Sequence, residues 1–282
     1  MIKLLFGVSE KSTTSTTSTQ IGESKNMKRA LHIGINDYPG TQNDLRGCVN
    51  DAARWKEVAQ RRSFSSFVTL LNNQATTSNV KKEMKKIIKN SKKDDTLLIT
   101  YSGHGSKVVD TNGDELDKVD ETWFLYNGHL VDDEIRAMLS EVADGVKVII
   151  ISDSCHSGTV TRALFSTLYA DDYSKPRYMP PKDAIECATI GSLEAIRPLG
   201  LPEKDMNHIL ITGCKSTEYS YDAHFDKPMG AMTYYATQII DSNPDITYNE
   251  FYTLLKKKLP SSKYPQSPQL EGSDEMKNSK ML

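Results

Sequence analysis

The chain has 282 residues, of which 38% are hydrophobic and 26% are charged, and its formal net charge is −2 at pH 7. This composition is typical of a globular protein with one sizeable core, and the charge gives no reason to expect nucleic acid or an anionic membrane as a partner. No apolar run reaches the roughly 18 to 20 residues of a transmembrane helix, and no signal peptide is recognisable. The four cysteines show no zinc spacing, so we expect reduced thiols and a cytoplasmic location.

Residues 1–26 contain a Ser/Thr-rich tract that is too polar to bury a core, and we expect this segment to be disordered. The chain then alternates apolar runs with amphipathic helical patterns. We expect strands at residues 30–35, 67–71, 96–101 and 208–212, and a strand around the apolar run 148–151 that ends just before Cys155. We expect helices at 50–61, near 80–88, near 135–142 and near 232–239, with a last helix after a capping box of Thr247 and Glu250.

This alternation predicts an α/β fold, a three-layer α-β-α sandwich around a mostly parallel sheet. The expected organisation is a single domain over residues 27–272 and a C-terminal tail over 273–282. Residues 159–207 carry five of the eleven prolines and no long periodic pattern, so they are expected to form an exposed loop excursion.

Two predicted strands end in residues that suit nucleophilic catalysis. His104 follows one strand within Ser-Gly-His-Gly, and Cys155 follows another. Neighbouring strands lie about 4.8 Å apart. If these two strands are neighbours, the imidazole and the thiol emerge side by side at one sheet edge, where the imidazole can take the thiol proton. The N–H groups of Gly105 and Cys155 would then form an oxyanion hole. Taken alone, each side chain suits a structural role, a buried cysteine or a loop-capping histidine. Together they favour catalysis.

The segments YSGHG (101–105) and DSCHSGT (153–159) resemble the histidine and cysteine motifs of the metacaspases and their bacterial relatives, the orthocaspases. Segments 45–52 (LRGCVNDA) and 230–235 (GAMTYY) also have counterparts in that family. The resemblance implies a caspase-like fold and a cysteine endopeptidase that cleaves after Arg or Lys through a thioester acyl-enzyme.

The resemblance also implies substrate-binding residues. Asp51 and Asp153 match two aspartates of the pocket for the basic side chain, and Ser102 matches a serine that contacts substrate. A buried carboxylate pairs strongly with a cation, which gives such specificity a physical basis. The structural alternatives are a carboxylate at a helix N-terminus for Asp51 and a hydrogen bond that orients a loop for Asp153.

Calcium is expected not to be required. Residues 110–121 resemble an EF-hand loop only in part, because Glu115 stands where the turn needs glycine. Asp120, Asp132 and Asp133 match three of the aspartates with which many metacaspases bind calcium. The fourth position is Arg162, whose positive charge would lower the affinity for the ion.

The sequence therefore predicts a monomeric cysteine endopeptidase whose partners are peptides or proteins with a basic residue before the cut. A non-catalytic caspase-like regulatory domain and a calcium-binding module are the alternatives. The 159–207 excursion is a candidate for self-cleavage, and the alternative, an exposed loop that stays intact, is left equally open. Its basic residues are Arg162, Lys175, Arg177, Lys182, Arg197 and Lys204. Cys48 and Cys214 are interpreted as structural.

Overall fold

The fold is described here from a computed structural model, which describes residues 26–109, 119–155, 174–180 and 208–282. Residues 1–25 of the segment predicted to be disordered, and most of the 159–207 excursion, Arg162 included, lie outside the described residues. In the part that is described, no helix is both long and apolar enough to cross a membrane.

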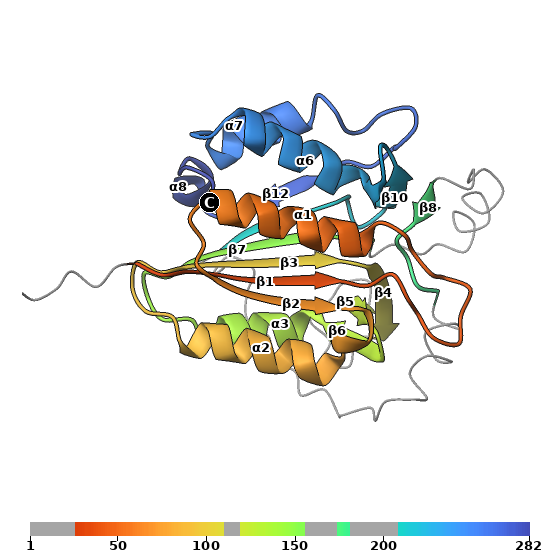
Figure 1. The fold of residues 1–282 in the computed structure, drawn as a ribbon, viewed down its shortest axis with the longest axis horizontal. Helices are drawn as coiled ribbons and strands as arrows, with labels where there is room; N and C mark the ends of the chain where they lie inside the picture. Colours follow the sequence, from red (N-terminus) through yellow and green to blue (C-terminus); the bar gives the residue numbers. More distant parts are fainter. Residues whose placement is uncertain (1–25, 110–118, 156–173, 181–207) are drawn as a thin grey trace, which may run out of the picture.

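A mostly parallel sheet forms the centre of the molecule (Figure 1). Within the described residues it has six strands in the order β12-β9-β7-β3-β1-β2, and only the pairing of β12 with β9 is antiparallel. β3 and β7 are central and almost entirely buried, as their continuous apolar runs predict. In order of position, the strands span Gln269–Glu271, His208–Thr212, Lys147–Asp153, Thr96–Ser102, Lys28–Gly34 and Ser66–Leu71.

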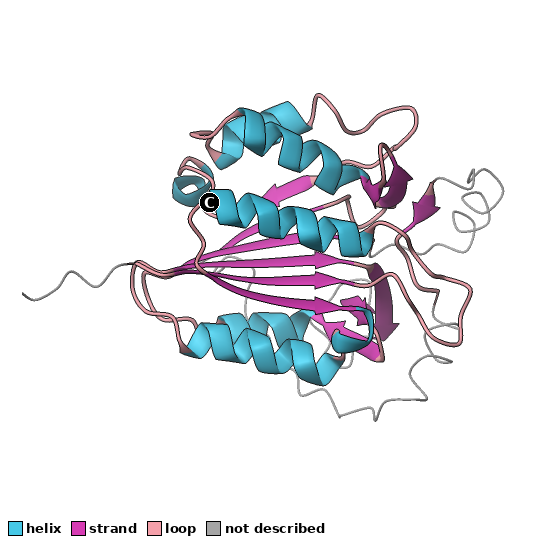
Figure 2. Ribbon diagram, viewed as in Figure 1, coloured by secondary structure: helices cyan, strands magenta, loops and turns pink. Residues whose placement is uncertain are grey.

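Helices cover both faces of this sheet, which confirms the predicted three-layer architecture (Figures 1 and 2). On one face lie α1 (Cys48–Arg61), α6 (Ala231–Ser242) and α7 (Tyr248–Leu255), and on the other lie α2 (Thr77–Lys89) and α3 (Asp132–Leu139). Two separate apolar clusters fill the layers between helices and sheet. The predicted capping box of Thr247 and Glu250 is present at the start of α7.

Two small antiparallel sheets stand at the carboxyl edge of the central sheet. The first consists of β4 (His104–Val109), β5 (Val119–Leu125) and β6 (Gly128–Val131). The second consists of β8 (Lys175–Pro176), β10 (Tyr221–His224) and β11 (Pro228–Gly230). β3 ends at Ser102, close to the predicted end of its strand, and the chain turns at Gly103 into β4, a strand that the sequence analysis did not predict.

The C-terminal residues belong to the domain and do not form a separate tail. α8 (Asp274–Lys277) begins at a cap in which the Ser273 hydroxyl accepts from the Met276 N–H. Met281 is buried in the apolar cluster beneath α6 and α7, and its N–H donates to the carbonyl of Ile246. The predicted domain end at residue 272 was therefore wrong, since burial of Met281 extends the core to the last residues.

Candidate active site

The site forms where the two central strands end. β3 and β7 are parallel neighbours, and their register sets Ser102 opposite Asp153. Each strand is followed two residues later by a residue suited to catalysis, His104 after Ser102 and Cys155 after Asp153. Both side chains are fully buried. The expected adjacency of the two strands is thus correct, and it brings both motifs to one edge of the sheet.

The ring of His104 is held in one orientation and one tautomer. Its Nε2 lies 2.6 Å from the carbonyl oxygen of Asn43, and because a carbonyl only accepts, Nε2 carries the proton. The ring packs against Tyr38, whose hydroxyl accepts from the His104 N–H at 2.8 Å. Nδ1 is buried and has no hydrogen-bond partner among the described residues. It therefore offers its lone pair to a proton donor.

Burial, opposed by the hydrogen bond to Asn43 and aided by the charges of Lys175 and Arg177, lowers the pKa of His104 to about 3. A charged imidazole without solvent is unfavourable, which is the physical cause of the shift. His104 is consequently neutral at pH 7, the form that can accept a proton.

The thiol of Cys155 is fixed by the main chain of Ser220. Sγ donates to the Ser220 carbonyl at 3.1 Å and accepts from the Ser220 N–H at 2.6 Å. Across the described part of the chain, no hydrogen bond joins this thiol to His104, whose Nδ1 remains unpartnered. In this arrangement the thiol proton is donated to the Ser220 carbonyl, so transfer to His104 requires that hydrogen bond to break.

The carbonyl of Arg177 sits between the two catalytic motifs. It accepts from the Gly105 N–H at 2.9 Å and from the Cys155 N–H at 3.1 Å. A Cβ at position 105 would lie 1.7 Å from the Cys155 carbonyl oxygen, so only glycine allows this approach. The Arg177 N–H also donates to the Ser220 carbonyl at 2.9 Å, which fixes the backbone on the other side.

The Arg177 side chain fills a closed acidic pocket. Nη2 donates to Asp51 at 2.7 Å and to Asp222 at 2.9 Å. Nη1 donates to the Ser102 hydroxyl at 2.7 Å and to the Asp153 carbonyl at 3.0 Å, with the Asp153 carboxylate 3.4 Å away. Both guanidinium ends are therefore bound by separate partners, the geometry for which arginine is suited.

Each carboxylate of the pocket is also held by neighbouring groups. Asp51 accepts from the Ser102 hydroxyl at 2.5 Å and the Gly230 N–H at 3.0 Å, and Asp153 accepts from the Thr233 N–H at 2.9 Å. Burial raises the pKa of Asp51 to about 6, with Arg177 opposing the shift and Asp153 adding to it. The pocket is thus a rigid group of three acids, Asp222 included, that favours a buried cation.

Comparisons with known proteins show which family the chain belongs to. Residues 28–163 match the sequence model of the metacaspase peptidase C14 domain. The chain is 32% identical to metacaspase-1 of Meyerozyma guilliermondii, an alignment that covers 90% of this chain and 71% of the relative. It is 30% identical to metacaspase-1B of Aspergillus terreus, over 87% of this chain and 75% of the relative. The chain belongs to the metacaspase family.

Solved structures show the fold that the chain shares with known proteins. A protein of Geobacter sulfurreducens is 29% identical, has a TM-score of 0.73, and is aligned over 90% of this chain and 97% of its own. Caspase-1 of Spodoptera frugiperda, at 10% identity and a TM-score of 0.55, shares the fold over 88% of this chain and 87% of its own. This metacaspase is therefore a cysteine endopeptidase of the C14 type with a caspase-like fold.

Sequence reasoning missed how the metacaspase pocket is filled. Residues 159–207 were expected to be exposed, but Arg177, Tyr178 and Met179 are buried. Arg177 forms ion pairs with the buried acids, and Met179 packs in the apolar core. Asp222 was missed entirely. It lies on β10 with no motif around it, and only the tertiary structure brings it to Arg177 and to the N–H groups of Arg46 and Gly47.

The aspartates considered for calcium lie apart from this pocket. Asp120 is on β5, while Asp132 and Asp133 open α3. Both α3 aspartates pair with Arg136, the first at 3.2 Å. Burial raises the pKa of Asp132 to about 7, and the charges of Asp133 and Asp120 add to the shift. A search for three or more His, Cys, Asp or Glu side chains placed to hold a metal finds no such group among the described residues.

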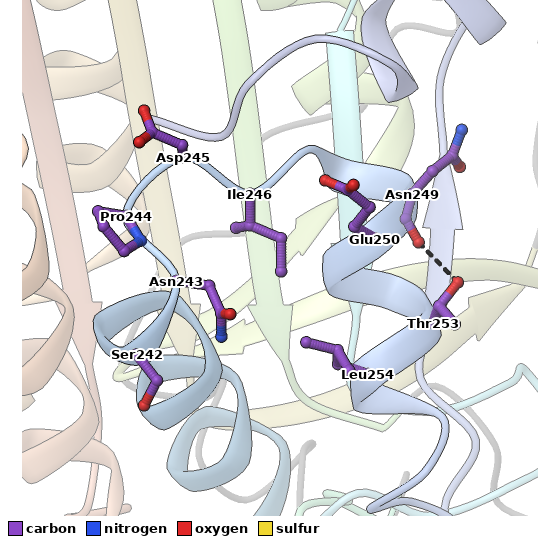
Figure 3. Close-up of a pocket in the computed structure, with 9 residues that line it drawn as sticks. All are labelled: Ser242, Asn243, Pro244, Asp245, Ile246, Asn249, Glu250, Thr253 and Leu254. Carbon is purple, nitrogen blue, oxygen red and sulfur yellow. Dashed lines mark hydrogen bonds between the residues drawn. The ribbon is translucent and has the colours of Figure 1, made fainter.

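Two further cysteines border the site, whereas a surface pocket lies away from it. Cys48 and Cys214 are buried, free thiols, and Cys214 belongs to the same buried cluster as Cys155. A pocket of about 660 Å³ lies between the end of α6 and the start of α7 (Figure 3). It is lined by residues 242–246, 249, 250, 253 and 254, none of which contributes to the acidic pocket or contacts Cys155.

Proposed function

We propose that this metacaspase cleaves peptide bonds after arginine and, more slowly, after lysine, with Cys155 as nucleophile and His104 as general base. The bound position of Arg177 carries the proposal. One residue has its side chain among three acids and its carbonyl on the N–H groups of Gly105 and Cys155. A substrate held in this way has both its specificity group and its reacting carbonyl in place.

The chemistry follows from the same atoms. Cys155 passes its proton to Nδ1 of His104, and the thiolate attacks the carbonyl carbon. Charge that develops on the oxygen is stabilised by the two N–H donors, while the imidazolium protonates the departing amine. The C–N bond breaks to give a thioester. Water then attacks the thioester with His104 again as base, and releases the acid and the free thiol.

The pocket favours arginine over lysine because its partners are divided between two guanidinium nitrogens. Lysine carries one ammonium group and reaches fewer of them. Hydrogen bonds to a charged group each contribute about 1.5–3 kcal/mol. The loss of one therefore corresponds to a preference of about 10- to 100-fold for arginine in kcat/KM.

The bond between Arg177 and Tyr178 is the one that the chain presents to its own site, so we extend the proposal to self-processing after Arg177. Five other basic residues lie between 159 and 207. Of these, Lys175 is described, and its ammonium group donates to the carbonyls of Gln42 and Asp44, outside the acidic pocket. A monomeric state and a cytoplasmic location stay predictions.

The test uses fluorogenic peptides that end in Arg, Lys or Asp before the fluorophore. Wild type should cleave the Arg peptide fastest and leave the Asp peptide intact. Cys155→Ala should abolish cleavage, while Cys187→Ala serves as the matched thiol control. Cleavage that survives in Cys155→Ala would refute the assigned nucleophile, and cleavage of no peptide would favour a regulatory domain.

Self-processing is tested by mass spectrometry of the purified chain. We expect a fragment that begins at Tyr178, absent from Cys155→Ala and from Arg177→Gln and present in Lys182→Gln. A fragment that persists in Arg177→Gln with the same N-terminus would contradict the proposal.

A further inference from the structure

The segment that fills the site continues beyond the bond that would be cut. Tyr178, the first residue after Arg177, forms a parallel β-bridge with Gly105 and has its ring 6.2 Å from that of Tyr219. Met179, the second, is fully buried. The two residues after Arg177 are therefore also fixed by contacts with the rest of the protein.

Met179 makes main-chain contacts that do not depend on its side chain. Its N–H donates to the Gly105 carbonyl at 2.9 Å, and its carbonyl accepts from the Ser106 hydroxyl at 2.9 Å. Gly105 and Ser106 are consecutive on β4, the strand that begins with His104. β4 thus supplies the base, one N–H to the reacting carbonyl, and the groups that hold the leaving side of the peptide.

The side chain of Met179 is received by an apolar site. It belongs to the larger buried cluster, which includes Tyr38, Leu45 and Phe124, and its sulfur accepts from the Asn43 amide at 3.6 Å. A long unbranched apolar side chain fits such surroundings, because it adapts to an irregular cavity. A carboxylate there would lose its hydration, and none of these neighbours supplies a positive charge.

We propose that these residues form a substrate-binding site for the second residue after the cut, selective for a methionine-like apolar side chain, with Ser106 and Gly105 binding its main chain. This inference rests on the proposed function, since it extends the same site along the departing half of the peptide. The substrates of this metacaspase would then carry a basic residue before the cut and an apolar residue at the second position after it.

The test compares two kinds of peptide with the full-length enzyme. A coumarin peptide ending in Lys-Pro-Arg contains nothing beyond the cut. Quenched-fluorescence peptides with Lys-Pro-Arg-Tyr-Met, and the same with Met replaced by Ala or Asp, extend into the proposed site. Both kinds of peptide must displace the enzyme's own Arg177–Met179 segment from the site. The ratio of kcat/KM for the extended peptide to that for the coumarin peptide cancels this shared competition.

We expect replacement of Met by Asp to lower this ratio by about 10-fold or more, which corresponds to loss of a buried apolar side chain. Ser106→Ala should lower it by about 3- to 10-fold for the Met peptide, the effect of one lost hydrogen bond. Ser140→Ala, which removes an exposed hydroxyl on α3's C-terminal cap, is the matched control.

The outcomes separate the two proposals. If the coumarin peptide is not cleaved, the proposed function fails. If it is cleaved while the Met, Ala and Asp peptides give equal ratios, the binding site for the departing side is refuted and the peptidase assignment stands. An equal effect of Ser106→Ala and Ser140→Ala would overturn the role of Ser106.

Discussion

Replacement of Arg177 tests the interpretation that this residue occupies a substrate pocket. The experiment uses Arg177→Gln in the Cys155→Ala background, so that self-cleavage does not alter the chain. Glutamine removes the positive charge and leaves Asp51, Asp153 and Asp222 buried without their cation. Loss of one partner from a buried ion pair costs about 3–5 kcal/mol.

For a chain of this size, 1 kcal/mol changes the melting temperature by about 2–4 °C. If the segment stays in place, the variant should melt about 6–20 °C lower. If the segment around residue 177 leaves the acidic pocket and water enters it, the loss of stability is smaller and the pocket is open to added peptide. In that case an added Arg peptide should raise the melting temperature of the variant more than that of its parent.

Differential scanning fluorimetry with and without the peptide measures both effects. Arg61→Gln is the control, because its ion pair with Asp241 is at the surface and contributes about 0–1 kcal/mol. An Arg177→Gln variant whose melting temperature and peptide response both equal those of its parent would refute the reasoning.

Three further predictions concern the same enzyme. Asp222→Asn should lower kcat/KM for Arg peptides by about 10- to 100-fold, since it weakens a charge-assisted hydrogen bond. A kcat/KM equal to that of wild type would show that Asp222 does not contribute to binding the substrate arginine. As the pH falls through about 6, protonation of Asp51 removes a negative charge that attracts the substrate cation, so kcat/KM should decline below that pH. His104, with a pKa of about 3, does not produce this decline, and a profile of Asp51→Asn with the same acid limb would contradict the assignment. Chelation by EGTA should leave Arg-peptide cleavage unchanged, because Asp132 and Asp133 both already pair with Arg136; loss of activity restored by calcium would show that a site forms despite Arg136.

Much of the fold was predictable because its signals are local. The continuous apolar runs of β3 and β7 indicate strands buried on both faces, and the capping box of Thr247 and Glu250 marks the start of α7. Alternation of such strands with amphipathic helices predicts the three-layer sandwich. Strand β4, by contrast, was missed, because its sequence has no continuous apolar run to mark it as a strand.

The catalytic motifs were also legible in the sequence. His104 and Cys155 each stand two residues after a buried strand, and the sequence made their meeting conditional on the two strands being neighbours, which the pairing of β3 with β7 confirms. Asp51, Asp153 and Ser102 were predicted as substrate-binding residues from the resemblance to metacaspases. In the structure all three contact the Arg177 side chain.

The sequence by itself thus determined the α/β architecture, the family and the candidate nucleophile and base, since each depends on short segments with strong local patterns. Only the tertiary structure decided which basic residue fills the pocket, that Asp222 is its third acid, and that Met179 is buried beside β4. These contacts join Arg177 to acids 126 and 45 residues away. No local pattern encodes them, because they depend on how distant segments pack at the sheet edge.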